Sequence, residues 1–190
     1  MFVNLPNFLT LLRVLLIPVL VLVWFIPMQY SGEIAAVIFI GAALTDWLDG
    51  WLARRWEQES AFGAFLDPVA DKLMVAAALV LLVDAFDSSL VTLSAIVIIG
   101  REIVVSALRE WMSEIGQRTQ VAVSWLGKVK TASQMLAITA CLALPIELKL
   151  THPGLWMLVF AALLTLWSMG TYLKAAWPHL LPSVGKSDPE

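Results

Sequence analysis

The stretch of sequence that decides the fold is Phe8-Leu-Thr-Leu-Leu-Arg13-Val-Leu-Leu-Ile-Pro18-Val-Leu-Val-Leu-Val-Trp24-Phe-Ile-Pro27. Almost all of its side chains are apolar. As a helix, it is about as long as the roughly 30 Å hydrocarbon core of a bilayer is thick. Because hydrocarbon offers no water to the peptide groups, the backbone must bond to itself, which predicts an α-helix that spans a membrane.

Further apolar runs of similar length follow along the chain. Together with the first, they cover residues 8–27, 33–52, 66–83, 90–108, 125–146 and 153–174. The 190 residues are 60% hydrophobic and 14% charged, whereas about a quarter of a soluble domain is charged. The sequence therefore predicts an all-α, polytopic membrane protein with six transmembrane helices. We expect one membrane domain over residues 1–176 and a short cytoplasmic tail over 177–190.

The positions of the basic residues predict the orientation. An even number of spans places both termini on one side of the membrane, and the connections 53–65 and 109–124 open to that side. These two connections carry four arginines, whereas the opposite side holds Lys149 alone among basic residues. Since Lys and Arg are enriched in cytoplasmic loops, we expect both termini to be cytoplasmic.

Four aspartates lie toward the predicted cytoplasmic ends of the second and third segments: Asp46, Asp49, Asp67 and Asp71. The first two are three residues apart and the last two are four apart, so each pair shares one face of its helix. Two neighbouring antiparallel helices would then direct four carboxylates into one space. Small residues beside them, Gly50, Ala53 and Gly63, allow the helices or a ligand to approach closely.

Placing four ionised carboxylates within apolar membrane helices costs free energy. An ionised aspartate at the centre of a membrane helix costs about 2.5–3.5 kcal/mol, and neighbouring like charges repel. Two divalent cations would cancel the four charges, and carboxylate oxygens suit Mg²⁺ or Mn²⁺. A pair of such ions can stabilise a phosphoryl displacement. The simpler alternative is helix capping, which the Asp67-Pro68 pair suits, but a cap does not explain four aspartates.

The aspartates belong to a longer pattern, Asp-x2-Asp-Gly-x2-Ala-Arg-x8-Gly-x3-Asp-x3-Asp, which residues 46–71 match at every fixed position. This pattern resembles the signature of the CDP-alcohol phosphotransferase family. Residues 4–13 resemble the amino-terminal part of that family. Residues 101–111 and 127–131 resemble its bacterial branch that uses glycerol 3-phosphate as the acceptor, so the resemblance covers most of the chain.

The resemblance implies a homodimer in the bacterial cytoplasmic (inner) membrane, with a site that faces the cytoplasm. It implies two metal ions, Mg²⁺ or Mn²⁺, held by the four aspartates and binding the pyrophosphate of CDP-diacylglycerol. Asp71 also matches the family position of the general base. The residues that would bind CDP-diacylglycerol through its nucleotide are Asn7, Thr10, Gly50, Arg54 and Gly63.

The implied reaction transfers the phosphatidyl group of CDP-diacylglycerol to sn-glycerol 3-phosphate and releases CMP. An acceptor that carries a phosphate needs a basic pocket beside the carboxylates. The candidates lie at the cytoplasmic ends of the fourth and fifth helices and are Arg101, Arg109, Arg118, Lys128 and Lys130. Each of them also suits contact with anionic lipid or a role in fixing topology.

Other functions stay open at this point. The same chemistry could use inositol phosphate, serine or phosphatidylglycerol as the acceptor, although the basic cluster favours a phosphorylated acceptor over serine. A cation transporter is the alternative from another class, because intramembrane carboxylates also mark ion pathways. Against it, the acidic residues gather at one side, and the middles of the first, fifth and sixth segments lack carboxylates. We expect no nucleic acid partner.

Overall fold

The computed structural model of the chain describes residues 5–56, 60–117 and 125–180, and these residues contain helices and no strands. The elements are α1 (Leu5–Phe25), α2 (Ser31–Trp56), α3 (Ala61–Phe86), α4 (Ser89–Glu114), α5 (Trp125–Ala143), the short 3₁₀ helix η2 (Ile146–Thr151) and α6 (Pro153–Leu180). The all-α prediction and the predicted order of six long helices are therefore confirmed.

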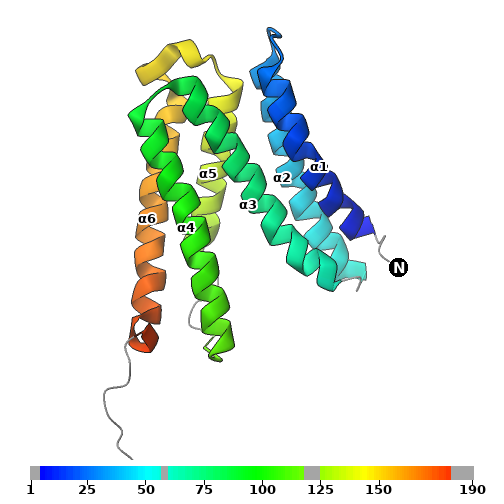
Figure 1. Cartoon of the computed structure of the whole chain (residues 1–190), viewed down its shortest axis with the longest axis vertical. Coiled ribbons are helices and arrows are strands. Elements are labelled where there is room, and N and C mark those ends of the chain that lie inside the picture. Colours follow the sequence, from blue (N-terminus) through cyan, green and yellow to red (C-terminus); the bar gives the residue numbers. More distant parts are fainter. Residues whose placement is uncertain (1–4, 57–59, 118–124, 181–190) are drawn as a thin grey trace, which may run out of the picture.

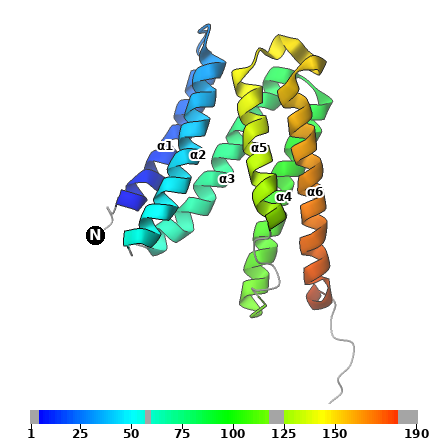
Figure 2. The same ribbon diagram turned by 180° about the vertical axis from the view of Figure 1, so that it is seen from behind.

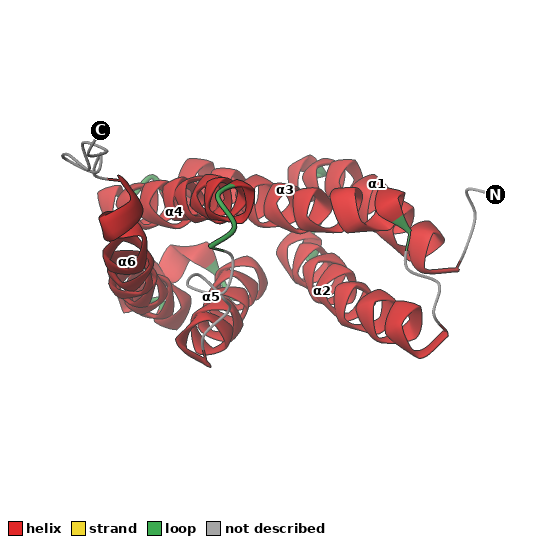
Figure 3. Ribbon diagram, turned by 90° about the horizontal axis from the view of Figure 1, so that it is seen from below, coloured by secondary structure: helices red, strands yellow, loops and turns green. Residues whose placement is uncertain are grey.

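The helices pack in two layers, and the first and the last described residue lie at the same end of the bundle. Helix α3 lies between α1 and α2 on one side and α4, α5 and α6 on the other (Figure 1). Seen from below, α1, α3 and α4 form one row and α2 and α5 form the other, while α6 lies at one edge of the bundle beside α4 and α5 (Figure 3). Helix α1 begins and α6 ends at the same end of the bundle, where α2 and α4 end and α3 and α5 begin (Figure 2). We call this end the site end.

The outside of the bundle is apolar. Large hydrophobic side chains lie exposed on it, among them Leu22 (65%), Val80 (61%) and Trp167 (71%). Apolar surface on this scale is unfavourable in water but is the natural contact with lipid. Of the described residues, 7–25, 89–114 and 153–179 form helices that are long and apolar enough to cross a membrane. The chain is thus a polytopic membrane protein, as its composition predicted.

The interior is filled by interdigitating side chains from the helices. At its centre lie residues whose exposure is 1% or less: Leu20, Phe39, Leu82, Ile98 and Leu158. A second apolar cluster between α4 and α6 includes Met112 and Tyr172. Because lipid is as apolar as these side chains, close packing rather than water exclusion holds such helices together.

Four helices, α2, α3, α4 and α6, extend further than the apolar pattern predicted, and the last two reach Glu114 and Leu180 rather than residues 108 and 174. The predicted connection over residues 53–65 is shorter in the structure, because α2 and α3 both continue into it. Helix α3 is capped by Ser60, whose Oγ accepts a 3.0 Å hydrogen bond from the Gly63 N–H. Asp67 therefore lies inside α3, so the capping alternative for this residue is wrong.

The approach of α2 to α5 depends on Gly32. A Cβ atom at this position would lie 2.6 Å from the carbonyl oxygen of Leu142. Because that oxygen belongs to the backbone, Gly32→Ala must push the helices apart. We expect it to lower the free energy of unfolding by about 2 kcal/mol, measured by denaturation of the protein in detergent.

The matched control is Gly41→Ala on the same helix. A Cβ atom at Gly41 would meet no described atom within 4 Å, and alanine favours the helix by up to about 1 kcal/mol. Equal stability of the two variants would contradict the close approach of α2 and α5.

Candidate active site

Three aspartates gather at the site end, where α1, α2 and α3 meet. Asp46 comes from α2, and Asp67 and Asp71 come from α3. Asp46 lies near enough to both of the others for their negative charges to repel. Asp49 also lies on α2, but its side chain is outside the described part of the chain. The structure thus brings together the three predicted carboxylates whose side chains it describes.

Helix α1 supplies polar partners to two of these carboxylates. Nη1 of Arg13 lies 2.9 Å from Oδ1 of Asp46, and Thr10 Oγ1 donates a 2.5 Å hydrogen bond to Oδ1 of Asp67. Arg13 and Thr10 are each 1% exposed. A buried arginine in an apolar helix requires an anionic partner, which Asp46 provides. The contacts with α2 and α3 therefore set the position of α1.

Gly63 allows α1 to come this close to α3. Ser60 Oγ donates a 2.7 Å hydrogen bond to Oδ1 of Asn7, beside Gly63. A Cβ atom at Gly63 would lie 3.0 Å from that same Asn7 oxygen and 3.8 Å from Oδ2 of Asp67. Of the residues predicted to bind the nucleotide, Asn7, Thr10 and Gly63 thus lie together next to Asp67.

The remaining predicted nucleotide-binding residues, Gly50 and Arg54, lie on α2, and their surroundings are outside the described part of the chain. Among the residues that the structure does describe, no three Asp, Glu, His or Cys groups are arranged to hold a metal ion. The predicted metal site includes Asp49, whose side chain is not described, so this site stays a prediction.

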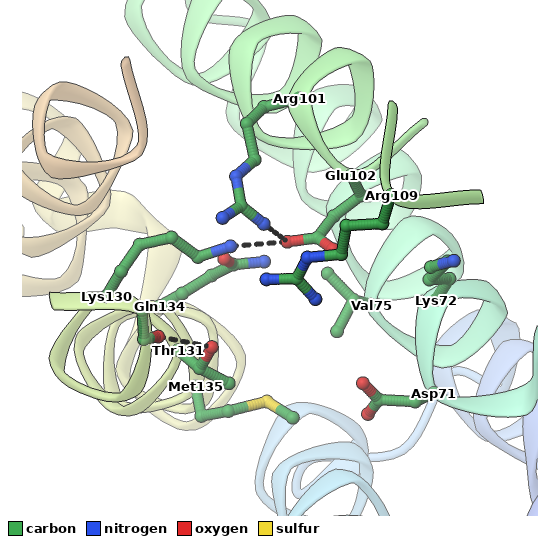
Figure 4. A pocket seen from close by; sticks show the side chains of 11 residues that line it. Asp71, Lys72, Val75, Arg101, Glu102, Arg109, Lys130, Thr131, Gln134 and Met135 are labelled. Atoms are coloured by element: carbon green, nitrogen blue, oxygen red, sulfur yellow. Dashed lines mark hydrogen bonds and ion pairs between the residues drawn. The ribbon is translucent and has the colours of Figure 1, made fainter. Parts of the chain in front are cut away.

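A cavity of about 240 Å³ lies beside the carboxylates, between α3, α4 and α5 (Figure 4). Asp71 lines one side of it, and three of the predicted basic residues are also among its lining residues: Arg101, Arg109 and Lys130. Of the two other predicted basic residues, Arg118 lies outside the described residues, and the side chain of Lys128 is not described. The cavity therefore joins a carboxylate to a group of cations.

The carboxylate of Glu102 pairs with two of these cations. Oε1 of Glu102 accepts a 3.0 Å hydrogen bond from Nη1 of Arg101 and a further one from Nζ of Lys130. Arg101 is 6% and Lys130 is 2% exposed, while Glu102 is one-quarter exposed. Because Glu102 neutralises one of the two positive charges, both cations can remain buried beside the cavity.

Side chains of helix α6 contact Arg101 and Arg109. Oη of Tyr172 accepts a 2.9 Å hydrogen bond from Nη2 of Arg109, and its ring lies 5.0 Å from the Arg109 guanidinium and 5.7 Å from that of Arg101. Nη2 of Arg101 also donates to Ser168 Oγ at 3.3 Å. These contacts orient both guanidinium groups by cation–π and hydrogen-bonding interactions.

Sequence reasoning did not assign the residues that support the site. Arg13 carried the clearest signal, because a charge in the middle of an apolar segment needs a partner. Glu102 carried a weaker one, as an acidic residue beside Arg101. Tyr172 gave none, because nothing in the sequence places the sixth helix behind the arginines of the fourth.

The chain is similar to known proteins over most of its length. A model of the CDP-alcohol phosphatidyltransferase family matches residues 3–171. The CDP-diacylglycerol–glycerol-3-phosphate 3-phosphatidyltransferase of Escherichia coli (strain K12) is 54% identical over 178 residues, which are 94% of this chain and 97% of that protein. Proteins of the same name from Shigella sonnei (strain Ss046) and Shigella flexneri serotype 5b (strain 8401) have the same identity and coverage.

The contact of Arg13 with Asp46 yields a prediction about stability. Arg13→Met leaves Asp46 near two other carboxylates without this cation, so we expect the free energy of unfolding in detergent to fall by about 3 kcal/mol. Arg13→Lys keeps the positive charge, so its free energy of unfolding should fall by less. In the Arg13→Met background, Asp46→Asn should restore part of the loss, and the absence of any recovery would show that the two residues are not coupled.

Proposed function

The chain belongs to the CDP-alcohol phosphatidyltransferase family, and from this premise we propose that it transfers the phosphatidyl group of CDP-diacylglycerol to sn-glycerol 3-phosphate, forming phosphatidylglycerophosphate and CMP. The printed name of the 54% identical relatives supports this donor and this acceptor. The structural observation that carries the proposal is the cavity in which Asp71 faces Arg101, Arg109 and Lys130. Such a cavity suits a molecule with a hydroxyl at one end and a phosphate at the other.

The cations of the cavity bind the phosphate of the acceptor in this proposal. Arg101 and Arg109 present planar guanidinium groups, which match phosphate oxygens. Lys130 adds a third positive charge beside them. Arg118 and Lys128 remain candidates for the same phosphate. Serine carries no phosphate, so this cluster favours glycerol 3-phosphate over serine as the acceptor.

Asp71 is the proposed general base. Its carboxylate accepts the proton of the acceptor's 1-hydroxyl as that oxygen forms a bond to the phosphorus that bears the diacylglycerol. The bond from this phosphorus to the bridging oxygen of the pyrophosphate breaks, and CMP leaves. An aspartate is a weak base, so holding the hydroxyl in line with the phosphorus contributes most of the rate.

We also propose that Asp46, Asp49, Asp67 and Asp71 hold two divalent cations, Mg²⁺ or Mn²⁺. The donor set supports this, because carboxylate oxygens are the ligands that these hard ions prefer. Arg13 offsets part of the negative charge around Asp46 and Asp71, and an excess remains. When bound, the ions would neutralise the pyrophosphate and the charge that develops during transfer.

On the donor side, Arg54 and Gly50 of α2 and Asn7, Thr10 and Gly63 are the proposed nucleotide-binding residues. We further propose that the site end faces the cytoplasm of a bacterium and that the chain lies in the inner membrane. The bias of Lys and Arg toward this side supports that orientation. The homodimer is proposed from the family resemblance.

The reaction is tested with purified protein in detergent, CDP-diacylglycerol, Mg²⁺ and separate acceptors. We expect release of CMP with glycerol 3-phosphate and at most background release with serine, inositol phosphate or phosphatidylglycerol. Chelation should stop release, and added Mg²⁺ or Mn²⁺ should restore it. Faster release with serine or inositol phosphate than with glycerol 3-phosphate would assign the chain a different acceptor.

The role of Asp71 is tested by Asp71→Asn. Loss of the base should lower kcat by about 10³-fold without loss of folding, which gel filtration and thermal unfolding in detergent would check. The control is Asp84→Asn, the same substitution on the same helix but at the exposed opposite end, which should keep full activity. Near-normal turnover by Asp71→Asn would exclude this residue as the base.

A further inference from the structure

The cavity contains a buried polar side chain that the reaction proposed above does not use. Gln134 lies on α5 and lines the cavity, and it is 4% exposed. Its buried Oε1 has no hydrogen-bond partner among the described residues. A buried amide oxygen without a partner costs free energy, so such groups usually have a role or a missing ligand.

The position of Gln134 is set by the helix that carries Lys130. The two residues are four apart, so they lie one turn from each other on the same face of α5. Figure 4 shows the Gln134 amide among the side chains of Lys130, Glu102 and Arg109. Lys130 is committed to Glu102, and Thr131, the other polar neighbour on α5, donates its hydroxyl to the Gly127 carbonyl at 3.0 Å. Among the described polar side chains of α5 that line the cavity, Gln134 is thus the neutral one whose oxygen has no hydrogen-bond partner.

The acceptor carries a neutral polar group. In glycerol 3-phosphate, the phosphate suits the cations and the 1-hydroxyl suits Asp71, which leaves the 2-hydroxyl between them. A carboxamide both accepts and donates hydrogen bonds, so it matches a hydroxyl without adding charge. Resting on the proposed function, we propose that Gln134 binds the 2-hydroxyl of the acceptor and thereby selects alcohols that carry it.

A purely structural glutamine would be expected to bond to the protein around it. The Gln134 oxygen does not, because it is buried, lines the cavity and has no hydrogen-bond partner among the described residues. Nε of Arg101 and Nε of Arg109, two groups of the cavity proposed above to bind the acceptor, share this state. The missing partner favours a ligand contact over a role in packing.

The test compares two acceptors, glycerol 3-phosphate and 3-hydroxypropyl phosphate, which has the same chain and phosphate but no 2-hydroxyl. We expect the unmodified protein to prefer glycerol 3-phosphate by at least about tenfold in kcat/KM, because a site built to bond a hydroxyl rejects the analogue that lacks it. In Gln134→Met, which keeps the length of the side chain, this preference should fall to about twofold or less. The rate with 3-hydroxypropyl phosphate should stay nearly unchanged.

The analogue also reports on folding, because a misfolded variant would lose both activities. If Gln134→Met does not fold, Gln134→Asn, which keeps the amide on a shorter side chain, should reduce the preference severalfold. Ser133→Ala is the matched control outside the cavity, since Ser133 donates its hydroxyl to the Lys130 carbonyl, and it should keep the full preference. Equal losses with both acceptors in a Gln134→Met protein that gel filtration shows to be folded, or no preference in the unmodified protein, would overturn the proposal. Release of CMP with neither acceptor would instead refute the proposed function.

Discussion

The structure depends on one constraint: charged side chains within apolar helices must find partners on neighbouring helices. Arg13 illustrates it, because this residue is buried on the first helix and reaches Asp46 on the second. Thr10, one turn before Arg13, reaches Asp67 on the third. The acidic residues therefore order the packing of α1 as well as forming part of the site. An apolar α1 would lack both contacts and would be free to rotate against its neighbours.

The same constraint operates on the other side of the cavity with the charges reversed. Arg101 and Lys130 come from different helices and share Glu102, so one anion joins α4 to α5. Tyr172 then ties Arg109 to α6. Asp71 lies between the two groups, close to both Asp46 and Glu102. The site is consequently an acidic cluster and a basic cavity that meet at one carboxylate.

Hydropathy located the helices well but misjudged where several of them begin and end, most clearly between α2 and α3. The apolar pattern stops at residue 52 and resumes at 66, since the polar residues between them lower the average. In the structure, α2 continues to Trp56 and α3 begins at Ala61, where Ser60 caps it. As a result, Asp67 is held by helix geometry rather than by a loop. Hydropathy describes the solvent around a helix, whereas backbone hydrogen bonds and caps decide its length.

The sequence by itself determined the all-α fold, the membrane environment, the order of the helices and the pairing of aspartates on one face of each helix. These features follow from composition and from the 3.6-residue period, which are local properties. The tertiary structure alone decided that Arg13 meets Asp46, that Glu102 joins Arg101 to Lys130, and that Gln134 is buried in the same cavity. Such contacts depend on how each helix is rotated and displaced relative to its neighbours. No local pattern encodes this arrangement, because it results from packing all the helices together.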